Sequence, residues 1–169
     1  MHMMQLWVNL PKADKMGTPG YQDIRAGAIP TVTLPENGGS LRVIAGSYGE
    51  ARGPAHTHTP MTMLDVNLQG GTTLKVALPP SFNALAVVLE GRATAGGKTA
   101  STGELVLFTN DGESLELNAD ENSHILILSG EPIEGPIVQH GPFVMNTRAE
   151  IHQAILDFNA GLFGRVPAG

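Results

Sequence analysis

The chain has 169 residues, enough for one domain with a substantial core, and its 21 glycines and 12 prolines favour short strands and turns over long helices. A formal net charge of −6 argues against direct binding to nucleic-acid phosphates, and the absence of cysteine excludes disulfides and thiol catalysis. No stretch reaches the roughly 18 uninterrupted apolar residues of a membrane span, and no secretory leader is recognisable. We therefore expect no membrane association and a cytoplasmic protein.

The first part of the chain predicts short strands separated by irregular segments. Residues 4–10 alternate between apolar and polar side chains, which is typical of a strand. Residues 11–27 have the composition of an irregular surface excursion, so residues 1–30 are expected to form an N-terminal strand followed by that excursion. Two further strands are predicted over residues 29–34 and 41–46, with a glycine-containing turn between them.

A loop predicted over residues 47–60 contains the first candidate metal ligands. His56 and His58 lie two residues apart, just before a strand predicted over residues 62–68. Side chains two apart on a strand share one face, so this periodicity, extended backwards, places both imidazoles on the face of Leu64; Pro60 weakens the extension. The pair is the one constellation in the sequence that could hold a metal, but we interpret both residues as polar loop and strand-edge residues; a metal and an organic ligand are the alternatives.

The middle of the chain predicts an all-β architecture. Glycine-rich turns separate a series of short apolar runs, and the run over residues 123–129 is nearly continuous, as in a strand buried on both faces. Strands at this spacing favour a double-sheet jelly roll rather than alternating strands and helices. The remaining predicted strands cover residues 74–78, 83–90 and 103–108.

One helix is predicted over residues 147–160. Thr147 and Glu150 form a capping-box pattern, in which each side chain accepts a hydrogen bond from the other residue's backbone. Gly161 stands where a helix-terminating residue belongs. The expected apolar face of the helix comprises Ile151, Ala154, Ile155 and Phe158.

Several long motifs resemble the pirin family. They are the Gln-Leu-Trp-Val-Asn-Leu-Pro run over residues 5–11, the Leu-Glu-Gly hairpin ending at Gly91, Ser-Gly-Glu-Pro over residues 129–132, and the stretch over residues 136–147. The similarity is to the C-terminal half of that two-barrel protein and extends to residue 164. It implies a cupin (RmlC-like) double-stranded β-helix, or jelly-roll barrel, with one C-terminal α-helix. We accordingly predict a single C-terminal cupin domain over residues 1–169.

The resemblance implies an activity for the other half of the protein. Full-length pirins are similar to metal-binding cupins whose N-terminal barrel holds iron through three histidines and one glutamate. They are associated with quercetin 2,3-dioxygenase activity and, in eukaryotes, with transcriptional coregulation. The C-terminal half in that family usually holds no metal, so the resemblance transfers no catalytic residue to this chain, and no cofactor is expected.

The residues around the central hairpin agree with this expectation. A cupin metal set places a His-x-His run before the first central strand and another histidine after the second, but residues 77–82 contain no ligand and residues 113–117 contain carboxylates without histidine. His56 and His58 would need a third ligand. His124 is the nominee, because Asp65 has the opposite strand parity to His56 unless a bulge intervenes.

Three functional hypotheses remain open. The first is a non-catalytic scaffold that binds a partner, with a homodimer or a second cupin domain covering an exposed face. The alternative is a dioxygenase of the quercetin 2,3-dioxygenase type, with iron or another first-row divalent metal at His56 and His58. The last is a barrel that binds a small molecule without a metal.

Overall fold

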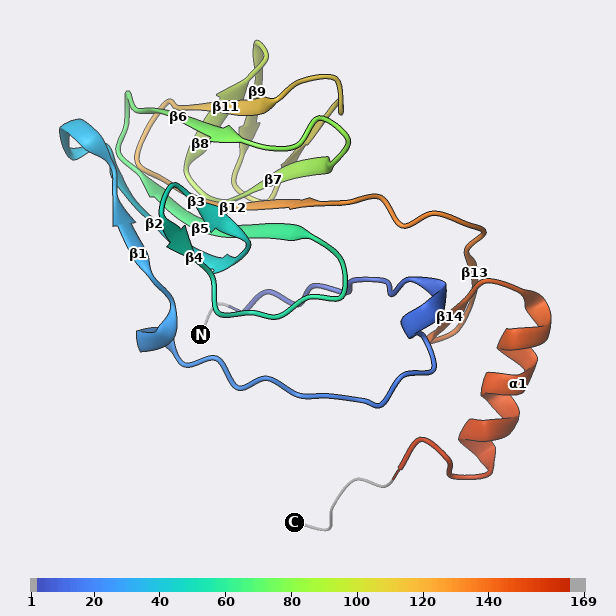
Figure 1. Cartoon of the computed structure of the whole chain (residues 1–169). Coiled ribbons are helices and arrows are strands. Elements are labelled where there is room, and N and C mark those ends of the chain that lie inside the picture. Colours follow the sequence, from blue (N-terminus) through green and yellow to red (C-terminus); the bar gives the residue numbers. More distant parts are fainter. Residues whose placement is uncertain (1–2, 165–169) are drawn as a thin grey trace. The chain divides into compact units, whose positions relative to one another are not determined.

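The computed structural model describes residues 3–164, and Figure 1 shows their elements in chain order. The chain divides into two compact units. One comprises residues 20–132, and the other combines residues 1–19 with residues 133–169. The single domain expected over residues 1–169 stays a prediction.

The larger unit is built on two antiparallel sheets. The six-stranded sheet has the order β1-β2-β5-β12-β7-β10, so that β12 pairs between two strands far from it in sequence. Its strands are β1 (Thr31–Thr33), β2 (Gly39–Ala45), β5 (Met61–Leu68), β7 (Asn83–Glu90), β10 (Leu105–Phe108) and β12 (Ser123–Gly130).

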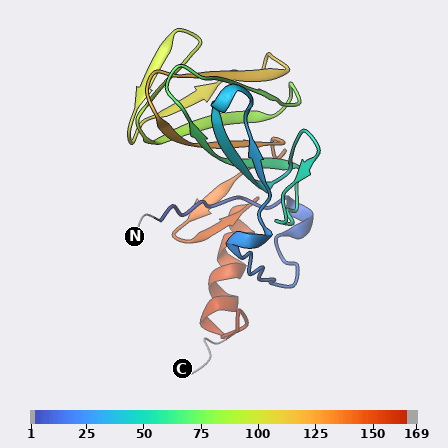
Figure 2. The same cartoon turned by 90° about the vertical axis from the view of Figure 1, so that its left-hand side faces the viewer.

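The four-stranded sheet has the order β6-β11-β8-β9, which makes β6 and β9 its two edges. Its strands are β6 (Thr73–Ala77), β8 (Arg92–Ala95), β9 (Lys98–Ser101) and β11 (Ser114–Ala119). A small hairpin of β3 (Ser47–Tyr48) and β4 (Ala51–Arg52) lies between β2 and β5 in sequence, and the short 3-10 helices Ala26–Ala28 and Pro35–Asn37 flank β1. Figure 2 shows the two sheets from a second direction.

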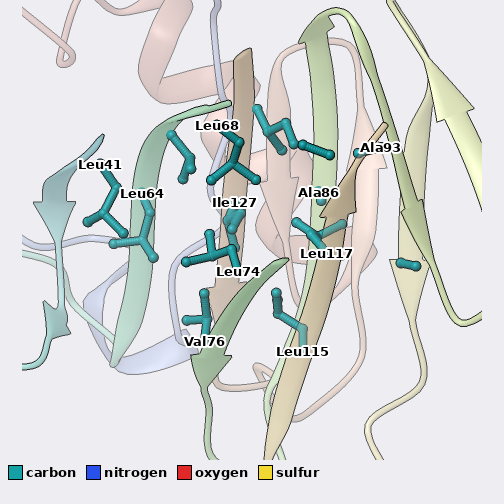
Figure 3. Packing of buried hydrophobic residues seen from close by; sticks show 14 of the residues in the cluster. Leu41, Leu64, Leu68, Leu74, Val76, Ala86, Ala93, Leu115, Leu117 and Ile127 are labelled. Atoms are coloured by element: carbon teal, nitrogen blue, oxygen red, sulfur yellow. The ribbon is translucent and has the colours of Figure 1, made fainter. Parts of the chain in front are cut away.

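The core of this unit lies between the two sheets. Leu64 and Ile127 come from the six-stranded sheet, while Leu74, Leu115 and Leu117 come from the four-stranded sheet, and all are almost fully buried. Figure 3 shows these side chains converging in one cluster. The alternation along β11, in which every second residue is buried, places one face of the strand on the core and the other toward solvent.

Most strand predictions are confirmed, with boundaries shifted by one or two residues. The run over residues 123–129 forms β12, which is buried on nearly all positions as expected. The strand expected over residues 4–10 is wrong: this segment forms no ladder, and Trp7 is largely exposed. Alternation alone does not make a strand, because the backbone also needs a neighbouring edge for its hydrogen bonds. No described strand pairs with residues 4–10.

The smaller unit contains the helix, a hairpin and a 3-10 turn, Lys12–Asp14. The hairpin joins β13 (Val138–His140) to β14 (Phe143–Met145), and helix α1 (Arg148–Asn159) packs on it. Both capping-box bonds form: the Glu150 N–H donates to Thr147 Oγ1 at 3.2 Å, and the Thr147 N–H donates to the Glu150 carboxylate at 2.8 Å. The predicted helix and its cap are therefore confirmed.

The expected apolar face of α1 is only partly buried. Ile151 and Ala154 are buried, but Phe158 is largely exposed. Its ring lies edge-on to Phe143, with the centroids 6.0 Å apart, and 6.3 Å from the ring of Phe163. The helix end therefore belongs to an aromatic cluster within the smaller unit.

Candidate functional site

His56 and His58 lie in the loop that leads into β5, not on the strand itself. β5 begins only at Met61, and both histidines are exposed. Strand periodicity therefore does not carry back through Pro60, and the expectation that both imidazoles share the face of Leu64 is wrong.

The backbone at His56 is fixed by a single side chain. The Gln22 amide accepts from the His56 N–H at 2.7 Å and donates to the His56 carbonyl at 2.8 Å. This bidentate contact holds the loop while leaving the imidazole outside the core. The described residues contain no group of three or more His, Asp or Glu side chains that could hold a metal ion. The donors here do not fit an iron centre of three histidines and one glutamate, and a metal at His56 and His58 stays a prediction.

His124 takes part in a different cluster, on the outer face of the six-stranded sheet. Its Nε2 lies 2.5 Å from one carboxylate oxygen of Asp65, and Arg42 donates to the other oxygen through Nε at 2.9 Å and through a second guanidinium nitrogen. The three residues come from the adjacent strands β2, β5 and β12. His124 is thus engaged by a carboxylate, not by the two loop histidines.

The electrostatics of this cluster centre on Asp65, which is only 7% exposed. Burial would raise the pKa of the Asp65 carboxyl, but hydrogen bonds from Arg42 and His124 outweigh it and hold that pKa below its ordinary value. Asp65 is therefore ionised at neutral pH. Because Arg42 and His124 engage both oxygens of the Asp65 carboxylate, the cluster joins three strands.

The segments in which a cupin usually carries its metal ligands contain other residue types in this chain. The segment before β7 contains no ligand, and Leu115 and Leu117 of β11 point into the core while Glu116 is exposed. Leucine, valine, isoleucine and alanine side chains make up the core between the sheets, and a cavity of about 240 Å³ lies at one end of it, beside Leu78, Ala84, Phe108 and Leu115. The inside of the barrel is a packed apolar core.

The outer face of the six-stranded sheet carries two rows of apolar side chains that sequence reasoning missed, exposed on β10 and buried at Leu126 and Leu128 of β12. In one cross-strand row Leu105 lies opposite Val87, which lies opposite Leu126; in the next, Leu107, Leu85 and Leu128 are aligned in the same way. Leu105 is 60% exposed and Leu107 71% exposed. We call these six residues the apolar rows. The signal was the Leu-Val-Leu-Phe run of residues 105–108, which is apolar on both faces of the strand.

The fold and the packed interior define the class: a cupin-type jelly roll whose usual ligand positions lack ligands. A protein-family model, the Pirin C-terminal cupin domain, matches residues 63–164. The chain belongs to the pirin family and carries its C-terminal cupin domain. The resemblance and the fold class read from the sequence are therefore confirmed.

Relatives match nearly the whole chain. It is 46% identical over 98% of its length to a Pseudomonas aeruginosa protein named "Putative quercetin 2,3-dioxygenase", covering 58% of that protein. It is 35% identical to human pirin, with 93% of the chain and 55% of pirin covered. A crystal structure of quercetin 2,3-dioxygenase from Acinetobacter baumannii superposes with a TM-score of 0.88 at 42% identity, covering 94% of this chain and 55% of that one. The chain thus spans somewhat more than half the length of these relatives.

No helix among residues 3–164 combines the length and apolar character needed to cross a bilayer. The cytoplasmic location stays a prediction.

Proposed function

We propose that this pirin-like cupin domain is a non-catalytic, partner-binding module, and that two copies associate through strand β10. The observation that carries the proposal is the exposure of Leu105 and Leu107 on a strand at the edge of its sheet. Edge strands of natural proteins usually carry charges or prolines that discourage pairing. All four residues of β10 are apolar.

The backbone of β10 is suited to pairing with another strand. The Val88 N–H donates to the Glu104 carbonyl, and bonding alternates along an antiparallel ladder, so Val106 and Phe108 direct their polar groups toward β7. The polar groups of Leu105 and Leu107 point away from β7, off the edge of the sheet. One strand thus presents both open hydrogen-bonding groups and exposed leucine side chains.

A second copy of the chain is the occupant that these features fit. Two β10 strands related by a two-fold axis run antiparallel, so the backbone N–H and C=O groups of Leu105 and Leu107 in each copy can bond to those of the other. The same surface is used by both copies, which makes the dimer a closed assembly. Leu105 and Leu107 of one copy then lie beside Leu105 and Leu107 of the other, so the apolar rows of the two copies become continuous. Such an interface leaves no β10 edge free for further growth.

The test is the oligomeric state of the purified chain. We expect a dimer at micromolar concentration by analytical ultracentrifugation, and a monomer for the double variant Leu105→Lys, Leu107→Lys, because charges on an edge oppose pairing. Leu162→Lys is the matched control, since Leu162 is 72% exposed but lies in the other unit. A monomeric parent chain, or a control that dissociates equally, contradicts the proposal; circular dichroism verifies folding.

The second candidate function is a metal-dependent dioxygenase of the quercetin 2,3-dioxygenase type. It is favoured by the names of relatives, among them the Pseudomonas aeruginosa protein. In this chain the metal would depend on His56 and His58. It ranks second because both lie in an exposed loop and the described residues offer no third ligand beside them.

A further inference from the structure

Strand β6 is the second open edge of the larger unit. It is the outermost strand of the four-stranded sheet and pairs with β11 alone. The Ala119 N–H donates to the Thr72 carbonyl and the Leu78 N–H donates to the Glu113 carbonyl. Because bonding alternates, even-numbered residues from 72 to 78 face β11, and the polar backbone groups of Thr73, Lys75 and Ala77 point off the edge.

These open groups adjoin a cleft of about 740 Å³, partly lined by Thr73, Leu74 and Lys75. Leu34 and Tyr48 contribute its apolar part. The two connecting segments that complete its wall, residues 35–38 and 69–72, are tied together by the Gln69 N–H, which donates to the Gly38 carbonyl at 3.0 Å. The free edge of β6 therefore borders a cleft with a fixed wall, in contrast to the apolar edge of β10.

We propose that this cleft binds an extended peptide segment of a partner protein, which adds to β6 as an antiparallel strand. Main-chain hydrogen bonds to Thr73, Lys75 and Ala77 would supply affinity, as in other complexes formed by strand addition. This binding is independent of the pairing of β10, because the two strands are edges of different sheets.

Strand alternation specifies the side chains of that peptide. The peptide residue opposite Lys75 shares the solvent face with the ammonium group. An unmatched lysine discourages pairing at an edge, so pairing with β6 requires a carboxylate opposite Lys75, in a cross-strand row that already contains Glu116 of β11. The next residue toward the peptide's C-terminus lies opposite Leu74 and points to the inner side, where Leu34 and Tyr48 line the cleft. The segment recognised is therefore an acidic residue followed by an apolar one, in extended conformation.

The probe is a capped, dye-labelled peptide of sequence Thr-Val-Asp-Val-Thr, with its aspartate aligned to Lys75. Fluorescence anisotropy with the full chain at low ionic strength is expected to show saturable binding. Amide hydrogen exchange is expected to slow at Thr73, Lys75 and Ala77, the groups that gain partners. Slowing at Leu105 and Leu107 in place of these residues would overturn the proposal, as would the absence of saturable binding.

Two matched pairs separate strand addition from unspecific adhesion. Methylating the backbone nitrogen of the peptide's aspartate removes a hydrogen bond to the backbone of Lys75 and should weaken binding at least about tenfold. Methylating the backbone nitrogen of the following valine, which faces away from β6, should change binding little.

The second pair changes the charge of the protein. Lys75→Glu should weaken binding about fivefold and favour the peptide with lysine in place of aspartate. Lys98→Glu, the same charge reversal on exposed β9, should have no effect. Equal effects within either pair contradict the assignment.

Discussion

At the residue scale, Asp65 shows how a charged side chain is accommodated in a nearly buried position of a sheet. Its two oxygens are shared between Arg42 and His124, so that all three neighbouring strands are joined through one carboxylate. A buried carboxylate is costly unless it is hydrogen-bonded and paired, and both conditions hold here. Removing the charge leaves two donors without their anion.

We expect Asp65→Asn to lower the free energy of unfolding at neutral pH by about 1–3 kcal/mol. This loss is smaller than for a fully buried ion pair, because Arg42 and His124 are partly exposed to solvent. Urea denaturation measures this change. Glu90→Gln, at an exposed position opposite His124, is the control and should change stability by no more than about 0.5 kcal/mol. Equal losses of unfolding free energy from the two substitutions would contradict a stabilising role for the Asp65 carboxylate.

The same carboxyl gives a pH dependence with a definite sign. The pKa of Asp65 is lower in the folded than in the unfolded chain, so its contribution to stability is present above the unfolded pKa of about 3.9 and is lost as the pH falls through the folded pKa. The stability difference between the parent chain and Asp65→Asn should therefore shrink as the pH is lowered below about 4. A difference that grew on acidification would contradict this assignment.

At the element scale, helix α1 is defined by its cap as much as by its apolar face. Glu150 Oε2 accepts from the N–H groups of both Asn146 and Thr147. Burial would raise the pKa of the Glu150 carboxyl, but these hydrogen bonds outweigh it and lower that pKa. Only Ile151 and Ala154 of the helix are buried, so the cap adds to a limited packing contribution.

Thr147→Ala is expected to destabilise the helix by about 1 kcal/mol, because the Glu150 N–H loses its acceptor. Amide exchange along α1 should accelerate, while exchange in β12, in the other unit, should not change. Thr147→Ser, which keeps the hydroxyl, should restore the parent rates. Uniform acceleration in both elements would mean that the helix opens only when the whole chain unfolds.

At the scale of the whole molecule, the question is whether the chain binds a metal. We expect the untagged protein to contain much less than one first-row metal ion per chain after purification, and His56→Ala, His58→Ala to leave that content unchanged, because two exposed histidines are too few ligands. Metal analysis by mass spectrometry tests this directly. A stoichiometric metal that disappears in the double variant would reverse the order of the two proposed functions.

The sequence by itself determined the all-β class, most strands, the helix with its cap and the family, because these follow from local periodicity, turn residues and motifs of contiguous residues. Only the tertiary structure decided which strands became edges, and hence that Leu105, Leu107 and Lys75 border open hydrogen-bonding groups. It also placed Asp65 beside His124, which lies 59 residues away in the chain. Sheet order depends on pairing between distant segments, and a one-dimensional pattern contains no record of that pairing.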